Sequence, residues 1–423
     1  MKKRLLITVL ATAGVSLAQT NALLTWEQCL AQTKAYNPAL VSARAAVREL
    51  EYGVASATSS FLPQISAKAS MSYGESEDST GDWDEKKSSS GSLSLSQDLF
   101  SGGGNVAKRK RALAQLEIGI QQYRKSLSDV ELQLRVAYID VLYAQDLVAL
   151  TEKIAKRRAD NVRLIQLRFD GGRENAGSLA RSKAQLSDAR YEVREAERSL
   201  AYALRNLAAA IGTMEPPPGA KGDLQAAAPG EVGDLKPLME QTPSYLIAAT
   251  QVEAAKLGLK VTRSARFPSL SFSASTGLSS GDYDTYRGSW SAGLSTSVPL
   301  YTGNQLQSDI AAAKEGLIQN EMDLMDEGNS LMASLTQSWN NYVNAVESET
   351  VQKELLDAEQ LRAEISTAKY KQGLLDYEDW DTIENTVINQ GKSYLQARRT
   401  SETRQANWKN ALGMSVWATE KGE

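Results

Sequence analysis

Residues 62–73 read LPQISAKASMSY, and the pattern of apolar residues changes within this short stretch from helical to strand-like. Beyond Pro63, apolar residues alternate with polar ones, so the pattern has a period of two. That alternation is typical of a β-strand whose two faces meet different solvents. About ten residues in this conformation cross a bilayer at a tilt. We therefore predict a strand over residues 64–73 that is long enough to span a membrane.

Three further stretches alternate in the same way, and we predict strands over residues 88–100, 269–278 and 288–301. Aromatic residues stand near the strand ends that adjoin helical sequence: Phe61, Phe100, Phe267 and Tyr301. Aromatic side chains at that level are typical of the interface between lipid and water. Water-soluble hairpins packed on a helix would also alternate, so the strands alone leave both interpretations open.

The sequence around these strands is duplicated, with an offset of 205 residues before the strands and 201 after them. The matching positions are Asn37-Pro38 and Thr242-Pro243, Leu62-Pro63 and Phe267-Pro268, LFSG at 99–102 and LYTG at 300–303, and Ile211-Gly212 and Leu412-Gly413. We predict a first repeat over residues 23–212 and a second over 238–413. A Pro- and Gly-rich linker over 213–237 joins them, and a tail follows over 414–423.

Long helices fill the rest of each repeat. From residue 105 to 169 there is no proline, and apolar residues recur every three or four positions, with Thr151 and Arg158 as polar interruptions. This sustained heptad pattern predicts a coiled-coil rod about 100 Å long at 1.5 Å per residue. We predict long helices over residues 104–169, 178–212, 304–370 and 376–412, paired as antiparallel hairpins. Asn37 and Thr242, each followed by proline, are N-caps of a shorter helix at the start of each repeat.

The composition excludes several classes of function. Among 423 residues there is no histidine and one cysteine, Cys29, which rules out a Ser-His-Asp or Cys-His pair, a His-ligated metal and an imidazole pH switch. We expect no enzyme activity, and no catalytic, cofactor-binding or metal-binding residues. The net charge of −4 argues against nucleic acid as a partner.

The N-terminus has the features of an export signal. Three basic residues at 2–4 and the apolar run 5–18 predict a signal peptide over residues 1–22, cleaved after residue 18 or residue 22. No later stretch approaches the roughly 20 apolar residues of a spanning helix, so strands would make any membrane crossing.

Four strands cannot close a barrel, and an open sheet edge is forbidden in lipid, so several chains must share one barrel. Two copies would supply eight strands, whose interior is filled by side chains, whereas three supply twelve and leave an aqueous bore. We expect a mainly α fold with membrane β-hairpins. Its trimer would form a 12-strand β-barrel continuous with an α-helical barrel.

The duplicated motifs, in this order and spacing, resemble those of the TolC-type family of outer-membrane efflux and secretion channels. The resemblance spans nearly the whole chain after the signal peptide. It implies a homotrimer in the outer-membrane lipid of a Gram-negative bacterium, with a long periplasmic helical tunnel. It also implies two partners, a periplasmic adaptor protein and an inner-membrane transporter of the RND, ABC or MFS type. The channel would then be the exit duct of a tripartite efflux or type I secretion system. The alternative is a structural or adhesive coiled-coil envelope protein without a through-pore.

The resemblance also implies roles for residues at the turns between the long helices. The positions that match the adaptor-docking tips are Gly171, Gly172, Gly373 and Leu374. The candidates for closing the periplasmic mouth are Tyr370, Asp376, Asp379, Asp381 and Arg173. Leu375 and Ser178 stand where the family has the arginine and acidic partners of that tyrosine. We therefore expect closure by other pairs, such as Arg173 or Arg181 with Asp376 or Glu378; alternatively, the acidic residues form a solvated first helical turn.

Overall fold

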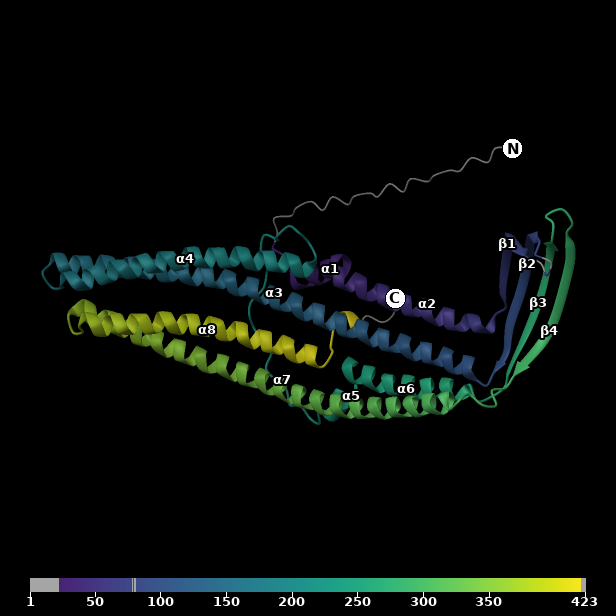
Figure 1. The fold of residues 1–423 in the computed structure, drawn as a ribbon. Coiled ribbons are helices and arrows are strands. Elements are labelled where there is room, and N and C mark those ends of the chain that lie inside the picture. The colour runs from purple at the N-terminus through teal and green to yellow at the C-terminus, as the bar shows by residue number, and fades with distance from the viewer. Residues whose placement is uncertain (1–22, 78, 80, 420–423) are drawn as a thin grey trace.

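The computed structural model describes residues 23–77, 79 and 81–419, so the signal peptide expected over residues 1–22 lies outside the described residues. The first repeat contains α1 (Trp26–Tyr36), α2 (Pro38–Thr58), a 3₁₀ turn η1 (Ser59–Phe61), β1 (Gln64–Glu77), β2 (Trp83–Ser101), α3 (Gly104–Asp170) and α4 (Ala176–Ile211). The second contains α5 (Lys236–Glu240), α6 (Pro243–Ser264), β3 (Ser269–Ser280), β4 (Arg287–Ser297), α7 (Gln305–Gln372) and α8 (Tyr377–Ala411), followed by α9 (Val416–Thr419). In Figure 1 the sheet stands at one end of the molecule and the turns between the long helices at the other.

Each repeat closes on its own beginning. The Asn37 side chain accepts from the Ala39 backbone N–H at 2.9 Å and so caps α2, and it donates to the Ala210 carbonyl at 2.9 Å. Gly212, at φ 95°, lies so close to this turn that a Cβ atom would come within 2.7 Å of the Tyr36 carbonyl oxygen. Gly413 lies against the Pro243 ring in the second repeat. The duplicated proline and glycine motifs therefore meet in space within each repeat.

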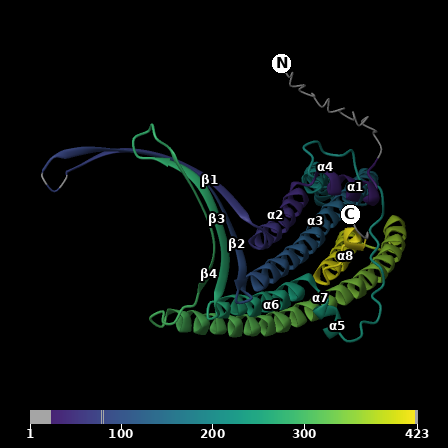
Figure 2. The same ribbon diagram turned by 90° about the vertical axis from the view of Figure 1, so that its right-hand side faces the viewer.

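The four strands form one antiparallel sheet in the order β1-β2-β3-β4, which leaves β1 and β4 as its edges. β4 ends at Ser297, short of the predicted residue 301, because Pro299 has no N–H to donate to the ladder. β1 and β2 extend beyond the prediction, to Glu77 and from Trp83, because backbone pairing continues where the apolar alternation stops. Figure 2 shows the sheet curving away from the helices.

The long helices lie side by side in a single layer (Figures 1 and 2). At the end remote from the sheet the neighbour order is α4, α3, α8, α7, and beside the sheet it is α2, α3, α6, α7. The largest apolar core lies between α3 and α4, where Leu134 and Leu207 are fully buried. Within the described residues, no helix combines the length and apolarity needed to cross a membrane.

The linker between the repeats is hydrogen-bonded to the helices that it crosses. The Gln145 side chain of α3 donates to the Ala220 carbonyl and accepts from its N–H, at 3.0 and 2.9 Å. Further along, the carbonyl of Leu224 accepts from Arg398 of α8, and the carbonyl of Ala227 accepts from Tyr342 of α7. The linker therefore ties the first repeat to the second. The predicted tail contains α9, whose Trp417 is buried in the same core.

Candidate functional site

The two turns remote from the sheet share one design. At the first, Gly172 has φ 68°, and the Arg173 N–H donates to the Arg168 carbonyl at 2.8 Å. At the second, Gly373 has φ 79°, and the Leu374 N–H donates to the Lys369 carbonyl at 2.9 Å. A left-handed glycine with this hydrogen bond is the Schellman ending of a helix. The next helices begin at side-chain caps, Asn175 accepting from the Ser178 N–H and Asp376 accepting from the Asp379 N–H.

These turns place the residues expected at the tips. Gly171, Gly172, Gly373 and Leu374 are all exposed at the far end of the rods, and the Leu374 side chain is 71% exposed. Arg173 is also exposed. It forms no ion pair with any described residue, so the expected pairing of Arg173 with Asp376 or Glu378 does not occur within one chain.

An aromatic stack joins the two hairpins just behind the tips. The rings of Tyr370 and Trp380 are parallel, with centroids 4.5 Å apart, and both side chains are buried. Ile165 of α3 and Leu179 of α4 complete the same cluster. The cluster therefore contains residues from all four long helices.

Tyr370 is bound by partners that the sequence prediction missed. Its hydroxyl donates to Glu174 at 2.8 Å, and its carbonyl accepts from Arg168 at 2.6 Å. The Arg168 guanidinium also lies over the Tyr370 ring, 4.3 Å from its centroid. Burial, followed by the Glu174 carboxylate, raises the pKa of Tyr370, which keeps the hydroxyl protonated as a donor. Leu375 and Ser178 cannot serve as the basic and acidic partners of Tyr370. Arg168 and Glu174 take these two roles instead.

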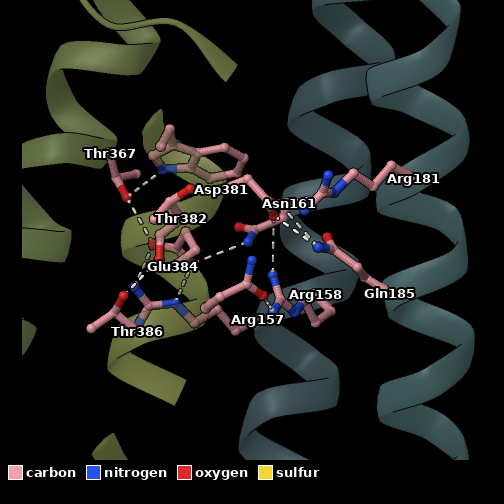
Figure 3. A network of polar contacts seen from close by, with 12 residues as sticks. Arg157, Arg158, Asn161, Arg181, Gln185, Thr367, Asp381, Thr382, Glu384 and Thr386 are labelled. Atoms are coloured by element: carbon pink, nitrogen blue, oxygen red, sulfur yellow. Dashed lines mark hydrogen bonds and ion pairs between the residues drawn. The ribbon is translucent and has the colours of Figure 1, made fainter. Parts of the chain in front are cut away.

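About one helical turn along α8 from Trp380, a second contact joins α8 to α3 (Figure 3). Glu384 is 1% exposed and accepts two hydrogen bonds from Arg157, at 2.7 and 2.6 Å. Asn161 and Thr367 donate to the same carboxylate, at 3.1 and 3.3 Å. Burial alone would raise the pKa of Glu384, but the hydrogen bonds and charge of Arg157 outweigh it and lower the pKa. The pair is therefore ionised.

Asp381 is buried between three helices instead of facing open solvent. Its carboxylate lies 3.1 Å from Arg181 of α4 and 3.7 Å from Arg158 of α3, and it accepts from Gln185 at 2.9 Å. Burial lowers the pKa of Arg158 even though Asp381 opposes that shift. Of the expected acidic residues, Asp379 remains exposed, whereas Asp376 caps α8. Arg158 could have been found from the sequence, because it is a charged residue within the apolar seam of α3.

Further ion pairs continue along α8 towards the sheet. Lys392 lies 2.5 Å from Glu192 of α4, and Arg399 lies 2.8 Å from Asp140 of α3. Closer to the linker, Arg135 of α3 lies 3.0 Å from Glu402, a residue that is 3% exposed. Ion pairs therefore recur along the contact of α8 with α3 and α4.

The sheet is the second notable region, because neither of its faces is covered by another layer. One face carries exposed apolar side chains, including Met71 at 73% and Trp290 at 81% exposure, and the other is rich in serine. The aromatic residues Phe61, Phe100, Phe267 and Tyr301 are exposed at the helix-proximal end, as an interfacial position requires. A large exposed apolar face is stable in lipid and not in water.

The fold and these two regions define an envelope protein in which a membrane-embedded sheet continues into long paired helices. The chain belongs to the outer membrane efflux protein family, whose model matches residues 29–213 and 236–414. It is an outer-membrane channel protein of the efflux and secretion class.

Individual relatives agree with this assignment. The chain is 26% identical to the outer membrane protein TolC of Escherichia coli over 439 residues, which cover 98% of this chain and 87% of that protein. It is 26% identical to the outer membrane efflux protein BepC of Brucella suis over 378 residues, 83% of this chain and 78% of that protein. The alkaline protease secretion protein AprF of Pseudomonas aeruginosa is 24% identical over 59% of this chain and 53% of its own length.

Two solved structures share the fold. CusC superposes with a TM-score of 0.82 at 16% identity, covering 91% of each chain. The open state of the MtrE outer membrane channel of Neisseria gonorrhoeae superposes with a TM-score of 0.80 at 17% identity, covering 92% of this chain and 89% of that one.

Proposed function

We propose that three copies of this chain close one 12-strand barrel in the outer membrane and form the exit duct of a tripartite efflux or type I secretion system. The sheet carries this proposal, because it has two open edges and two uncovered faces of opposite polarity. Open edges are not tolerated in lipid, so β1 of one copy must pair with β4 of the next. A barrel of twelve strands has an open bore, whereas the interior of an eight-strand barrel is filled by side chains.

The helical layer supports the same closure, because its outer members also lack a neighbour on one side. α7 carries an exposed apolar stripe at helical spacing that includes Ile318, Met322 and Met325. On the opposite edge of the layer at this level, beside the sheet, α2 exposes Val41 and Tyr52. Association of these two edges would bury both sets and continue the barrel below the membrane.

The test of the duct is the mass and conductance of the purified protein. Detergent-extracted protein should have the mass of a trimer and conduct ions in a planar bilayer. A water-soluble monomer, or a trimer that never conducts, would favour the coiled-coil envelope protein without a through-pore.

The tips are proposed to dock a periplasmic adaptor that links the duct to an inner-membrane transporter. Their support is geometric, because Gly172 and Leu374 lie exposed at the end farthest from the sheet. Cysteines placed at these two positions can be crosslinked in cells without first removing the native cysteine. The native Cys29 is fully buried, and burial together with Glu27 raises the pKa of its thiol to about 12, so it does not react. Captured adaptor supports the proposal, and capture that is equal from Lys314, far from the tips, contradicts it.

The contacts behind the tips are proposed to hold the mouth of the duct closed. Arg157 with Glu384, and Tyr370 with Glu174, fix the α7–α8 hairpin against α3 and α4. Replacing Arg157 by Gln and Tyr370 by Phe should release that hairpin and raise the conductance of the bilayer. A matched change on the exposed side of α4, Arg194→Gln, should leave it unchanged.

A further inference from the structure

Serine is the commonest residue on the polar face of the sheet. The register aligns Ser66, Ser94, Ser275 and Ser291 in one row across all four strands, and the row on either side contains two further serines, Ser96 with Ser273 and Ser92 with Ser289. We call this surface, the polar face over residues 64–70, 90–98, 269–279 and 287–297, the serine wall. Its small side chains take little space from a bore.

The hydroxyls of the serine wall are largely bonded to one another. Ser66 lies 2.8 Å from Ser94, and Ser271 lies 2.8 Å from Ser295, oxygen to oxygen. The same pairing occurs between Ser70 and Ser90. Hydroxyls that already have partners gain little from binding a passing solute, so the wall itself has weak preferences.

Three charged side chains interrupt this neutral surface. Lys68 stands one row beyond the all-serine row, and Arg287 stands in the next row outward, so both lie in the part of the wall remote from the helices. Asp98 lies three rows in the other direction from Lys68. At two residues per row that separation is about 20 Å, twice the screening length at 0.1 M salt. The carboxylate therefore does not neutralise the two cations.

Lys68 and Arg287 are both exposed, and neither forms an ion pair with a described residue. Beyond Arg287 the polar face carries both signs, with Lys86 and Asp84 on the protruding β1–β2 hairpin. A net positive zone is therefore confined to the outer part of the serine wall.

We propose that Lys68 and Arg287 of three copies form a cationic collar in the outer part of the bore, which favours anionic solutes over cationic ones of equal size. This inference rests on the proposed trimeric duct. A 12-strand barrel has a radius of roughly 12 Å, given strand spacing and tilt. The three Lys68 charges alone, at that distance in water and screened at 0.1 M salt, change the ratio of anion to cation at the axis about threefold, and the three Arg287 charges add to this.

A cysteine on the wall can measure this field directly, whether or not the mouth is open. Ser92 shares a row with Lys68, so Ser92→Cys should react with water-soluble methanethiosulfonate reagents in proteoliposomes. The anionic sulfonate reagent should react faster, relative to the cationic trimethylammonium reagent, than it does with free cysteine. That preference should fall about threefold or more when Lys68→Gln and Arg287→Gln are added.

Two controls separate the possible failures. Exchanging the cations, Lys68→Arg with Arg287→Lys, should keep the preference for the anionic reagent. Leu93→Cys, on the apolar face, should not react with either reagent. A preference that is unchanged by the two glutamines would overturn the collar alone. If Leu93→Cys reacts and Ser92→Cys does not, the orientation of the sheet in the duct is wrong and the proposed function fails with it.

Discussion

Replacing Arg157 and replacing Glu384 should destabilise the protein by different amounts, although the two residues form one ion pair. Replacing Arg157 by leucine leaves a carboxylate that is 1% exposed, whereas replacing Glu384 by leucine leaves a guanidinium whose side chain is 39% exposed. The stranded carboxylate cannot reach water, and the stranded guanidinium can. Arg157→Leu should therefore destabilise the contact between α3 and α8 more than Glu384→Leu does.

The magnitudes follow from burial. Removing one partner of a buried ion pair costs about 3–5 kcal/mol. Asn161 and Thr367 still donate to Glu384 in Arg157→Leu, which places this variant near the lower limit, about 3 kcal/mol. Glu384→Leu should cost about 1 kcal/mol, because solvent screens the exposed cation. The double leucine variant should cost less than the sum of the two single changes.

The difference should also depend on pH. In the native protein the pKa of Glu384 is lowered, so its contribution to stability is present above the unfolded pKa of about 4.3 and is lost as pH falls through the folded pKa. In Arg157→Leu the main lowering cause is gone, and burial raises the pKa of the carboxyl. Protonation then relieves the penalty, so the deficit of this variant should shrink from pH 7.5 to pH 5.

Amide hydrogen exchange in α8 is the suitable assay, because it reports local opening and does not require reversible unfolding of a membrane protein. Exchange of α8 amides around residue 384 should rise a hundredfold or more in Arg157→Leu at pH 7.5 and about fivefold in Glu384→Leu. Arg194→Leu, on the exposed side of α4, serves as the matched control. Equal effects of the two changes, or a deficit that grows on acidification, would show that Glu384 is not a buried carboxylate that depends on Arg157.

Three further changes test other parts of the molecule. Tyr370→Phe removes the hydrogen bond to Glu174 and should cost about 1–2 kcal/mol, seen as faster exchange of the tip amides. Gly172→Ala should lower tip stability by about 1 kcal/mol because of its left-handed φ, whereas Gly171→Ala, at φ −82°, should not, as local proteolysis would show. Leu224→Ala, at a residue that is 2% exposed, should cost about 2–5 kcal/mol and loosen the linker, measured as faster exchange of the linker amides. Leu238→Ala, a site that is 36% exposed, should have a much smaller effect.

The order of the elements could be predicted because their signals are local. Prolines and glycines mark the ends of the helices, and the predicted long helices agree with the observed ones to within two residues at each end. The strand ends at the β1–β2 loop were predicted less well, because β2 begins at Trp83, where the apolar alternation has stopped. The linker was harder, because its hydrogen bonds involve backbone groups and partners as distant as Gln145 and Arg398. The prolines and glycines of residues 213–237 indicate a linker, but nothing in this sequence indicates that Leu224 is buried.

The partners of Tyr370 were missed for a geometric reason. In the family resemblance, the position of the acidic partner matches residue 178, which is a serine in this chain. The Schellman turn at Gly172 brings Glu174, four residues earlier, to the tyrosine hydroxyl instead. Asp381 was expected at the mouth, but helical spacing turns its side chain towards Arg158 and Arg181. Such placements depend on how two hairpins pack, which one sequence does not specify.

The different chemistry of the two kinds of helix contact bears on how a duct of this kind could open. Within the first hairpin, α3 and α4 share buried aliphatic residues such as Leu134 and Leu207, whose separation would expose apolar surface at about 25 cal/mol per Å². Between the hairpins, α8 meets α3 and α4 through ion pairs, whose partners regain hydration when they part, and through smaller apolar clusters such as Ile154 with Ile388 and Ile165 with Trp380. Separation of one hairpin from the other therefore exposes less apolar surface than separation of α3 from α4. The linker hydrogen bonds at Ala220 and Leu224 hold the two repeats together near the middle of the rods, so movement of the α7–α8 hairpin should be greatest at the tips.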